Sequence, residues 1–239
     1  MLKYVLFDLD GTLLPMSQEE FTKYYLSALC KKMAKFGFEP HKLGDSIWKG
    51  VAFMIKNVGN ETNEELFWKS FEEDYGKDAK KYIPEFEEFY KNEFVLAKEA
   101  CKPNAFVPQM IQKLKEKGLK FVVATNPIFP EIAINRRISW AGLERSDFEL
   151  VTTYENSSSA KPNLKYYQDI LNVIQAKPEE CLMVGNDVSE DMVAKKLGLD
   201  VFLVTECLIN RKNEDISTLN QGTFENLIEY IDKKMQIQA

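Results

Sequence analysis

The 239-residue sequence is poor in the residues that build most metal and thiol sites. It has one histidine, His41, and its four cysteines stand far apart, with none in a Cys-x-x-Cys pair. Histidine-rich metal sites, zinc sites and dithiol redox chemistry are therefore not supported. The glycine patterns of P-loop and dinucleotide-binding proteins are absent as well, and so is the Gly-x-Ser-x-Gly pattern of serine hydrolases.

Long apolar runs and an excess of positive charge are also missing. No stretch reaches the roughly 18 apolar residues that a membrane span needs, and Met1–Phe7 lacks the sections of a signal peptide. The formal net charge is −6, so the chain has no general attraction for nucleic acid or anionic membranes. We expect a cytoplasmic protein that binds neither nucleic acid nor membrane.

What the sequence does contain is an ordinary globular share of hydrophobic residues, 45%, arranged in short runs. Such runs are typical of strands in a parallel sheet that helices cover on both faces. The five expected strands are Tyr4–Phe7, Lys120–Ala124, Glu149–Thr152, Cys181–Val184 and Val201–Val204. Apolar residues at helical spacing lie between them, at Val107–Lys117, Leu164–Ile174 and Glu190–Leu197. This alternation predicts the α/β class, with a doubly wound, Rossmann-like parallel sheet.

One connection is far longer than the others. More than a hundred residues separate Thr12 from the second expected strand, although a simple crossover needs only about a dozen. The interval has the pattern of helices at Glu19–Phe36, Leu43–Lys56, Asn63–Asp74 and Phe86–Lys98. We therefore predict an α/β core at 1–15 and 102–239, interrupted by an all-helical module at 16–101. Its aromatic residues, which we expect to form the module's own core, include Trp48, Phe53, Phe67 and Trp68.

Two carboxylates follow the first expected strand. Asp8 and Asp10 are two residues apart, which places them on the same side of an extended strand. Ligands bind at the carboxyl ends of the strands in open α/β sheets. Two acids this close repel each other unless a cation or a proton lies between them.

Further polar residues follow the other expected strands. Thr125 and Asn126 come after the second strand and carry groups that can donate to a phosphate oxygen. Lys161 precedes Pro162 after the third strand and can supply a point charge. Taken singly, Thr125 and Asn126 are more simply interpreted as part of a turn, and Lys161 as a solvated charge. Their placement after successive strands favours a common binding site.

Two more acids follow the fourth strand. Asp187 stands at the strand end, and Asp191 lies near the start of the next helix, where an acid also serves as a helix cap. Carboxylate and carbonyl oxygens suit a hard cation such as Mg²⁺, which retains waters and accepts phosphate oxygens. The collected strand ends therefore indicate a magnesium and phosphate site.

These residues resemble the four motifs of the haloacid dehalogenase (HAD) superfamily. The resemblance rests on Asp8-Leu9-Asp10-Gly11-Thr12, Thr125, Lys161 and Gly185-Asn186-Asp187 with Asp191. The long helical insert is similar to the superfamily's first class of cap domain. The fourth motif reads Gly-Asn-Asp instead of the commoner Gly-Asp, which leaves the role of Asp191 open.

The resemblance implies a role for each position. Asp8 would attack phosphorus, and Asp10 would protonate the leaving oxygen and then deprotonate water. Leu9, through its amide, would join Thr125, Asn126 and Lys161 in holding the phosphoryl group. Mg²⁺ would bind Asp8, the Asp10 carbonyl and Asp187, with Asp191 as a ligand or an outer support. The substrate would be a small phosphorylated metabolite, and the protein a monomer or weak homodimer.

Other chemistries of the superfamily stay as alternatives. Dehalogenases lack the second acid of the first motif, so Asp10 argues against that activity. A sugar phosphomutase needs the same two acids and also a cap that excludes water and holds a second phosphate. The cap lysines Lys49 and Lys56 are candidates for that phosphate, but solvated helix charges are the simpler interpretation of them. A non-catalytic phosphate-binding relative is disfavoured because every motif acid, the threonine and the lysine are present.

Overall fold

The computed structural model describes residues 1–238 and contains a six-stranded parallel sheet. The strand order is β3-β2-β1-β4-β5-β6, which is the order of doubly wound dinucleotide-type folds. The strands are β1 (Tyr4–Phe7), β2 (Lys120–Val123), β3 (Leu150–Val151), β4 (Cys181–Gly185), β5 (Asp200–Val204) and β6 (Gln221–Gly222). The predicted α/β class is confirmed, and β1 lies between β2 and β4, where the chain reverses direction across the sheet.

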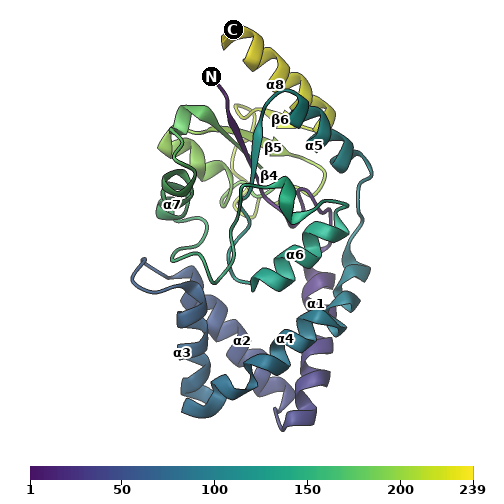
Figure 1. Cartoon of the computed structure of the whole chain (residues 1–239), viewed down its shortest axis with the longest axis vertical. Helices are drawn as coiled ribbons and strands as arrows, with labels where there is room; N and C mark the ends of the chain where they lie inside the picture. The colour runs from purple at the N-terminus through teal and green to yellow at the C-terminus, as the bar shows by residue number, and fades with distance from the viewer. Residues whose placement is uncertain (239) are drawn as a thin grey trace.

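Alternate residues of each strand pack against opposite layers of helices. Val5 and Phe7 of β1 belong to one buried cluster, whereas Tyr4 and Leu6 belong to the other. The first cluster contains α5 (Phe106–Glu116) and α8 (Phe224–Gln238), and the second contains α7 (Leu164–Ile174). Figure 1 shows α7 on one side of the sheet and α5 with α8 on the other. Burial on both faces explains why the strands are continuous apolar runs.

The insert between β1 and β2 is helical, as predicted. It consists of α1 (Gln18–Met33), α2 (Pro40–Ile55), α3 (Asn63–Tyr75) and α4 (Ile83–Lys91), with 3₁₀ segments at Ala34–Phe36, Lys77–Tyr82 and Glu93–Ala100. In Figure 1 these helices form a separate group at the end of the molecule opposite the two termini. Helix α1 is the first element of the insert. Its N-terminus is capped by the Ser17 side chain, shortly after the loop that follows β1. The domain boundaries at 15/16 and 101/102 stay a prediction.

The two connections between core and cap run side by side. Met16 pairs with Cys101 in an antiparallel bridge, and the Lys102 amide donates to the Pro15 carbonyl at 2.7 Å. The Ser17 amide donates to the Ala100 carbonyl at 3.2 Å. These hydrogen bonds join the two segments that connect core and cap into one short antiparallel pair.

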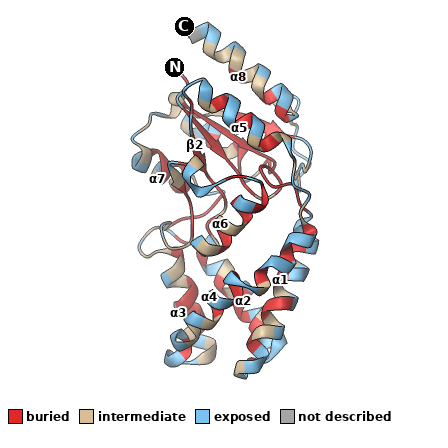
Figure 2. Cartoon of the chain, turned by 45° about the vertical axis from the view of Figure 1, so that its right-hand side comes forward, coloured by how far each residue is buried: buried red, intermediate tan, exposed pale blue. Residues whose placement is uncertain are grey.

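Some expectations on the elements were wrong. The helix expected at Glu190–Leu197 is a 3₁₀ segment at Met192–Leu197, because Asp191 and the residues before it form turns around the site. The helix expected at Phe86–Lys98 is divided at Asn92 between α4 and a 3₁₀ segment. Two of the four aromatic residues assigned to the cap core are not buried, since Trp48 is 52% and Phe53 41% exposed. Figure 2 shows that buried and exposed residues alternate along the cap helices.

Among the α-helices and strands, α6 (Glu131–Trp140), α8 and the two-residue strand β6 were not expected. Of these, α6 matters most for the site, because it lies between the sheet and the cap helices in both views (Figures 1 and 2). None of the helices within residues 1–238 is long and apolar enough to cross a membrane.

Candidate active site

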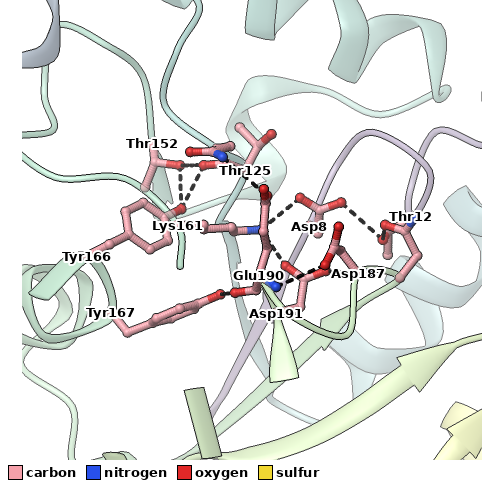
Figure 3. Close-up of polar contacts among 12 residues, drawn as sticks. Asp8, Thr12, Thr125, Thr152, Lys161, Tyr166, Tyr167, Asp187, Glu190 and Asp191 are labelled. Carbon is pink, nitrogen blue, oxygen red and sulfur yellow. Dashed lines mark hydrogen bonds and ion pairs between the residues drawn. The ribbon is translucent and has the colours of Figure 1, made fainter. Parts of the chain in front are cut away.

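Asp8 is the first residue after β1, at the carboxyl edge of the sheet. One of its carboxylate oxygens accepts a hydrogen bond from Lys161 Nζ at 2.9 Å, and the other accepts one from Thr12 Oγ1 at 3.2 Å. The Asp8 amide donates to the Val184 carbonyl of the neighbouring strand at 2.9 Å, which fixes the backbone. The carboxylate is thus held between Lys161 and Thr12 (Figure 3), and Asp8 lines a cavity.

Lys161 joins Asp8 to a second acid. Its ammonium lies 2.9 Å from Asp8 and 2.6 Å from Asp191, and its side chain is only 1% exposed. Burial alone would lower the pKa of Lys161, but the charges of Asp191 and Asp8 raise it well above its usual range. Burial raises the pKa of Asp191, and the ammonium limits that rise. Lys161 is therefore a permanently charged group beside Asp8.

Asp10 is bound on one side by an arginine that the sequence pattern did not reveal. Its Oδ2 accepts a hydrogen bond from Nη1 of Arg137, a fully buried residue of α6. Within residues 1–238, Asp10 Oδ1 is buried and has no hydrogen-bond partner. Burial raises the pKa of Asp10, Arg137 limits the rise, and the charge of Asp8 adds to it. One oxygen is thus anchored while the other is unengaged.

The backbone at two glycines allows this crowding. Gly11 has φ +90°, and a Cβ there would lie 2.5 Å from Asn186 Nδ2. A Cβ at Gly185 would collide with the Asp191 carboxylate. Asn186 in turn accepts a hydrogen bond from Thr12 Oγ1 at 3.0 Å. The absence of two side chains thus lets the first and fourth motifs pack against each other.

Asp187 lies two residues after the end of β4 and lines the same cavity as Asp10. Its Oδ1 accepts from the amides of Ser189 and Glu190 at 2.9 and 3.0 Å. Its Oδ2 lies 2.7 Å from Nη1 of Arg211, whose other terminal nitrogen donates to Gln18 Oε1 of the cap at 3.5 Å. Arg211 therefore links this acid to the first cap helix.

The remaining predicted site residues lie around the same edge. Thr125 and Asn126 line the cavity, and Asn126 donates from Nδ2 to Glu190 Oε2 at 3.2 Å. The Thr125 carbonyl is fixed by the hydroxyls of Tyr166 and Thr152, each at 2.8 Å (Figure 3). The Leu9 side chain is fully buried in the core, so that only its main chain is available to a ligand.

These groups open into one cavity of about 380 Å³ between core and cap. That volume is within the range of small-molecule sites. Asp8, Asp10, Thr125 and Asp187 lie at its core end, and residues of all four cap helices form the other end. The structure thus brings together the predicted strand-end residues, with Lys161 directly behind Asp8.

The acids at this edge of the sheet form an oxygen donor set that suits Mg²⁺. Asp8, Asp10 and Asp187 line the cavity, and the donors that they can offer a metal ion are carboxylate and main-chain carbonyl oxygens. In the described part of the chain, no three His, Cys, Asp or Glu side chains gather to hold a metal ion alone. Two carboxylates with a carbonyl are all-oxygen donors, which fits an ion that keeps several of its waters. Both carboxylate oxygens of Asp191 are engaged, Oδ1 by Lys161 Nζ at 2.6 Å and Oδ2 by the Asp187 amide at 2.9 Å.

Arg137 and Arg211 are the functional candidates that motif spacing missed. A signal for Arg137 was present, because Ala133, Ile134 and Ile138 form one apolar helix face on which Arg137 also falls. An arginine on a buried face requires an anionic partner. No comparable signal exists for Arg211, which lies in an irregular segment after β5.

A family model described as haloacid dehalogenase-like hydrolase matches residues 2–198. A phosphoglycolate phosphatase of Aquifex aeolicus is 24% identical over 200 residues, which cover 82% of each chain. A pyrophosphatase PpaX of Bacillus cereus is 23% identical over 212 residues, covering 87% of this chain and 85% of its own.

Solved structures share the fold over nearly the whole chain. A 2-haloacid dehalogenase from Pseudomonas syringae matches with a TM-score of 0.62 and 18% identity, over 98% of this chain and 99% of its own. A HAD phosphatase from Thermococcus onnurineus matches with a TM-score of 0.59 and 20% identity, over 96% and 98%. At this level of identity the likeness establishes the architecture, and it does not distinguish between the two activities.

Proposed function

The chain belongs to the haloacid dehalogenase-like hydrolase family, and from that membership we propose that it is a magnesium-dependent phosphatase. It hydrolyses a small phosphomonoester through an aspartyl-phosphate on Asp8. The observation that carries the proposal is the Asp8 carboxylate held by Lys161 and Thr12, with an unengaged oxygen of Asp10 nearby. Relatives named as a phosphatase and a pyrophosphatase support phosphorus as the centre attacked.

In the first step, an Asp8 oxygen attacks phosphorus and the bond from phosphorus to the leaving oxygen breaks. Asp10 gives its proton to that oxygen from the unengaged Oδ1. The raised pKa of Asp10 favours the protonated form that this step needs. Lys161 offsets the negative charge around the transferring group.

In the second step, water attacks the aspartyl-phosphate. Asp10, now ionised, takes the proton of the water, and the bond between phosphorus and Asp8 breaks. Phosphate leaves, the Asp8 carboxylate is restored, and Asp10 again carries its proton. Asp8, Asp187 and the Asp10 carbonyl would hold Mg²⁺, which would supply Lewis-acid stabilisation of the negative charge in both steps.

Hydrolysis is preferred to phosphoryl return to a sugar. Lys49, one of the two cap cations considered for a second phosphate, pairs with Asp74 at 2.8 Å and Glu73 at 2.9 Å. Neither Lys49 nor Lys56 is among the described residues that line the cavity. A bisphosphate intermediate would therefore lack these cations, which supports water as the acceptor.

The test is phosphate release by the purified protein from a broad panel of phosphomonoesters, with Mg²⁺ and with EDTA. We expect Mg²⁺-dependent release that Asp8→Asn abolishes. Phosphate release by the Asp8→Asn variant would show that Asp8 is not the nucleophile. Transfer of the phosphoryl group between sugar positions without phosphate release would favour the phosphomutase. We further propose that the protein works in the cytoplasm as a monomer or weak homodimer, without nucleic acid or membrane partners.

A further inference from the structure

The cavity has two chemically different ends. All of its charged lining residues come from the core and gather around the phosphoryl site. The end formed by the cap has no Asp, Glu, Lys, Arg or His among the described lining residues. It is built mainly from aromatic and aliphatic side chains of α1 to α4, including Phe21, Trp48, Val51, Phe67, Trp68 and Tyr90.

We call these cap residues that line the cavity the apolar wall. They are not simply the hydrophobic core of the cap. Ile47, Trp48, Val51 and Ile55 occupy one side of α2 and all line the cavity. Trp48 is 52% exposed and Ile55 42% exposed, although both are large apolar residues. Exposed apolar residues that converge on a cavity mark a surface that binds an apolar ligand.

The tyrosines of the wall add no charge. The hydroxyls of Tyr25 and Tyr90 lie 3.0 Å apart and bond to each other. Burial raises the pKa of Tyr25 to about 12, and it raises the pKa of Tyr90 well above its usual range. Both groups are therefore neutral, and their polar atoms are already paired.

The cations near the cavity each pair with an acid of the site. Lys161 and Arg137 are 1% and 0% exposed, pair with Asp8 and Asp10 respectively, and are not among the residues that line the cavity. Nη2 of Arg137, whose guanidinium lies 5.6 Å from the centre of the Phe21 ring, is buried without a hydrogen-bond partner in residues 1–238. Arg211 lines the cavity but lies 2.7 Å from Asp187. A second anionic group on the substrate would be placed in apolar surroundings without a counterion, which is unfavourable.

Accordingly, and resting on the phosphatase function above, we propose that this cavity selects phosphomonoesters whose leaving group is a bulky, uncharged, apolar alcohol or phenol. Small substrates with a second anionic group, of the kind named for the relatives, are disfavoured. The phosphate occupies the end with Asp8, and the carbon skeleton lies between Trp48 of the cap and Phe129 of the core, both of which line the cavity.

The first experiment compares kcat/KM, with Mg²⁺, for 1-naphthyl phosphate and hexyl phosphate against phosphoglycolate and pyrophosphate. We expect the apolar esters to be at least about tenfold better, because their carbon skeletons leave water on binding. A preference for the doubly anionic substrates would overturn the proposal and leave the phosphatase function intact. Release from neither class would overturn both.

A matched pair of variants tests the wall itself. Trp48→Ala removes a cavity residue, whereas Phe53→Ala removes a similarly exposed aromatic of the same helix that does not line this cavity. We expect Trp48→Ala to raise KM for 1-naphthyl phosphate several-fold with a smaller change for phosphoglycolate, and Phe53→Ala to change neither. Equal effects of both variants on both substrates would contradict the assignment.

Binding without turnover gives an independent measurement. Benzylphosphonate and phosphonoacetate are non-hydrolysable probes that differ in an apolar ring and a carboxylate. We expect benzylphosphonate to bind more tightly and to change the tryptophan fluorescence, since Trp48 and Trp68 both line the cavity. Tighter binding of phosphonoacetate would overturn the proposal even if the activity assays failed.

Discussion

Arg137 and Asp10 form an ion pair that joins helix α6 to the loop after β1, in which the Asp10 side chain is 22% exposed. The guanidinium is fully buried, and its carbon lies 4.4 Å from the centre of the Phe129 ring and 5.6 Å from that of Phe21. A second hydrogen bond runs from Nε to the Ala133 carbonyl at 3.3 Å. The arginine is thus fixed on three sides, and it fixes one oxygen of the proposed acid.

The first prediction concerns Arg137→Met. The positive charge of Arg137 stabilises the ionised form of Asp10, so its removal raises the pKa of Asp10 further. We expect the limb of the kcat profile that reports Asp10 to move to higher pH, and kcat to fall by about 10–100-fold because the acid is less well oriented. The measurement is kcat against pH for wild type and variant.

Arg136→Met is the control, because it removes an adjacent arginine that is only half-buried and is not bonded to Asp10. It should leave the pH profile in place. Thermal unfolding separates a structural effect, since loss of a buried ion-pair partner destabilises by up to about 3 kcal/mol. Unfolding at lower temperature with an unchanged pH profile would mean that Arg137 serves stability alone.

The α/β core could be predicted closely because strands that are buried on both faces of the sheet are continuous apolar runs in the sequence. Strand β1 has the predicted limits, and helix α7 does too. Strand β6 could not be recognised, since its two residues, Gln221 and Gly222, carry no apolar side chain. Helix α8 had a usable signal at Phe224, Leu227 and Ile231, which recur at helical spacing and are buried.

The site was predictable to the extent that strand ends meet at one edge. Parallel strands deliver Asp8, Thr125 and Asp187 to the same end of the sheet, whatever the loops do. No comparable rule predicts which side chains far apart in the sequence will contact each other. The contact between Arg137 and Asp10 spans 127 positions, and it depends on how α6 packs beneath the cap. The apolar wall also depends on packing, because aromatic spacing alone does not distinguish a cavity lining from a core.

The second prediction separates the roles of two acids of the fourth motif. Asp187→Asn removes a proposed metal ligand, so we expect the Mg²⁺ concentration for half-maximal activity to rise by at least about tenfold. Asp191→Asn removes the charge opposite Lys161, so we expect kcat to fall by about 10–100-fold while the Mg²⁺ requirement changes little. Titration of activity with Mg²⁺ measures both quantities.

A larger rise in the Mg²⁺ requirement for Asp191→Asn than for Asp187→Asn would reverse the two assignments. Calorimetric titration of Mg²⁺ into the protein without substrate provides the check, because it does not depend on turnover.

The last prediction concerns the close approach at Gly185. A methyl group there would collide with the Asp191 carboxylate, whose partner is Lys161. We expect Gly185→Ala to destabilise the fold by about 1–3 kcal/mol through overpacking and to reduce activity by displacing the lysine from Asp8. Gly44→Ala is the matched control: a Cβ at this position in α2 meets nothing within 4 Å, and alanine should stabilise the helix by about 0.5–1 kcal/mol. Denaturant unfolding and phosphate release measure both variants, and a neutral Gly185→Ala would show that Asp191 can move without consequence.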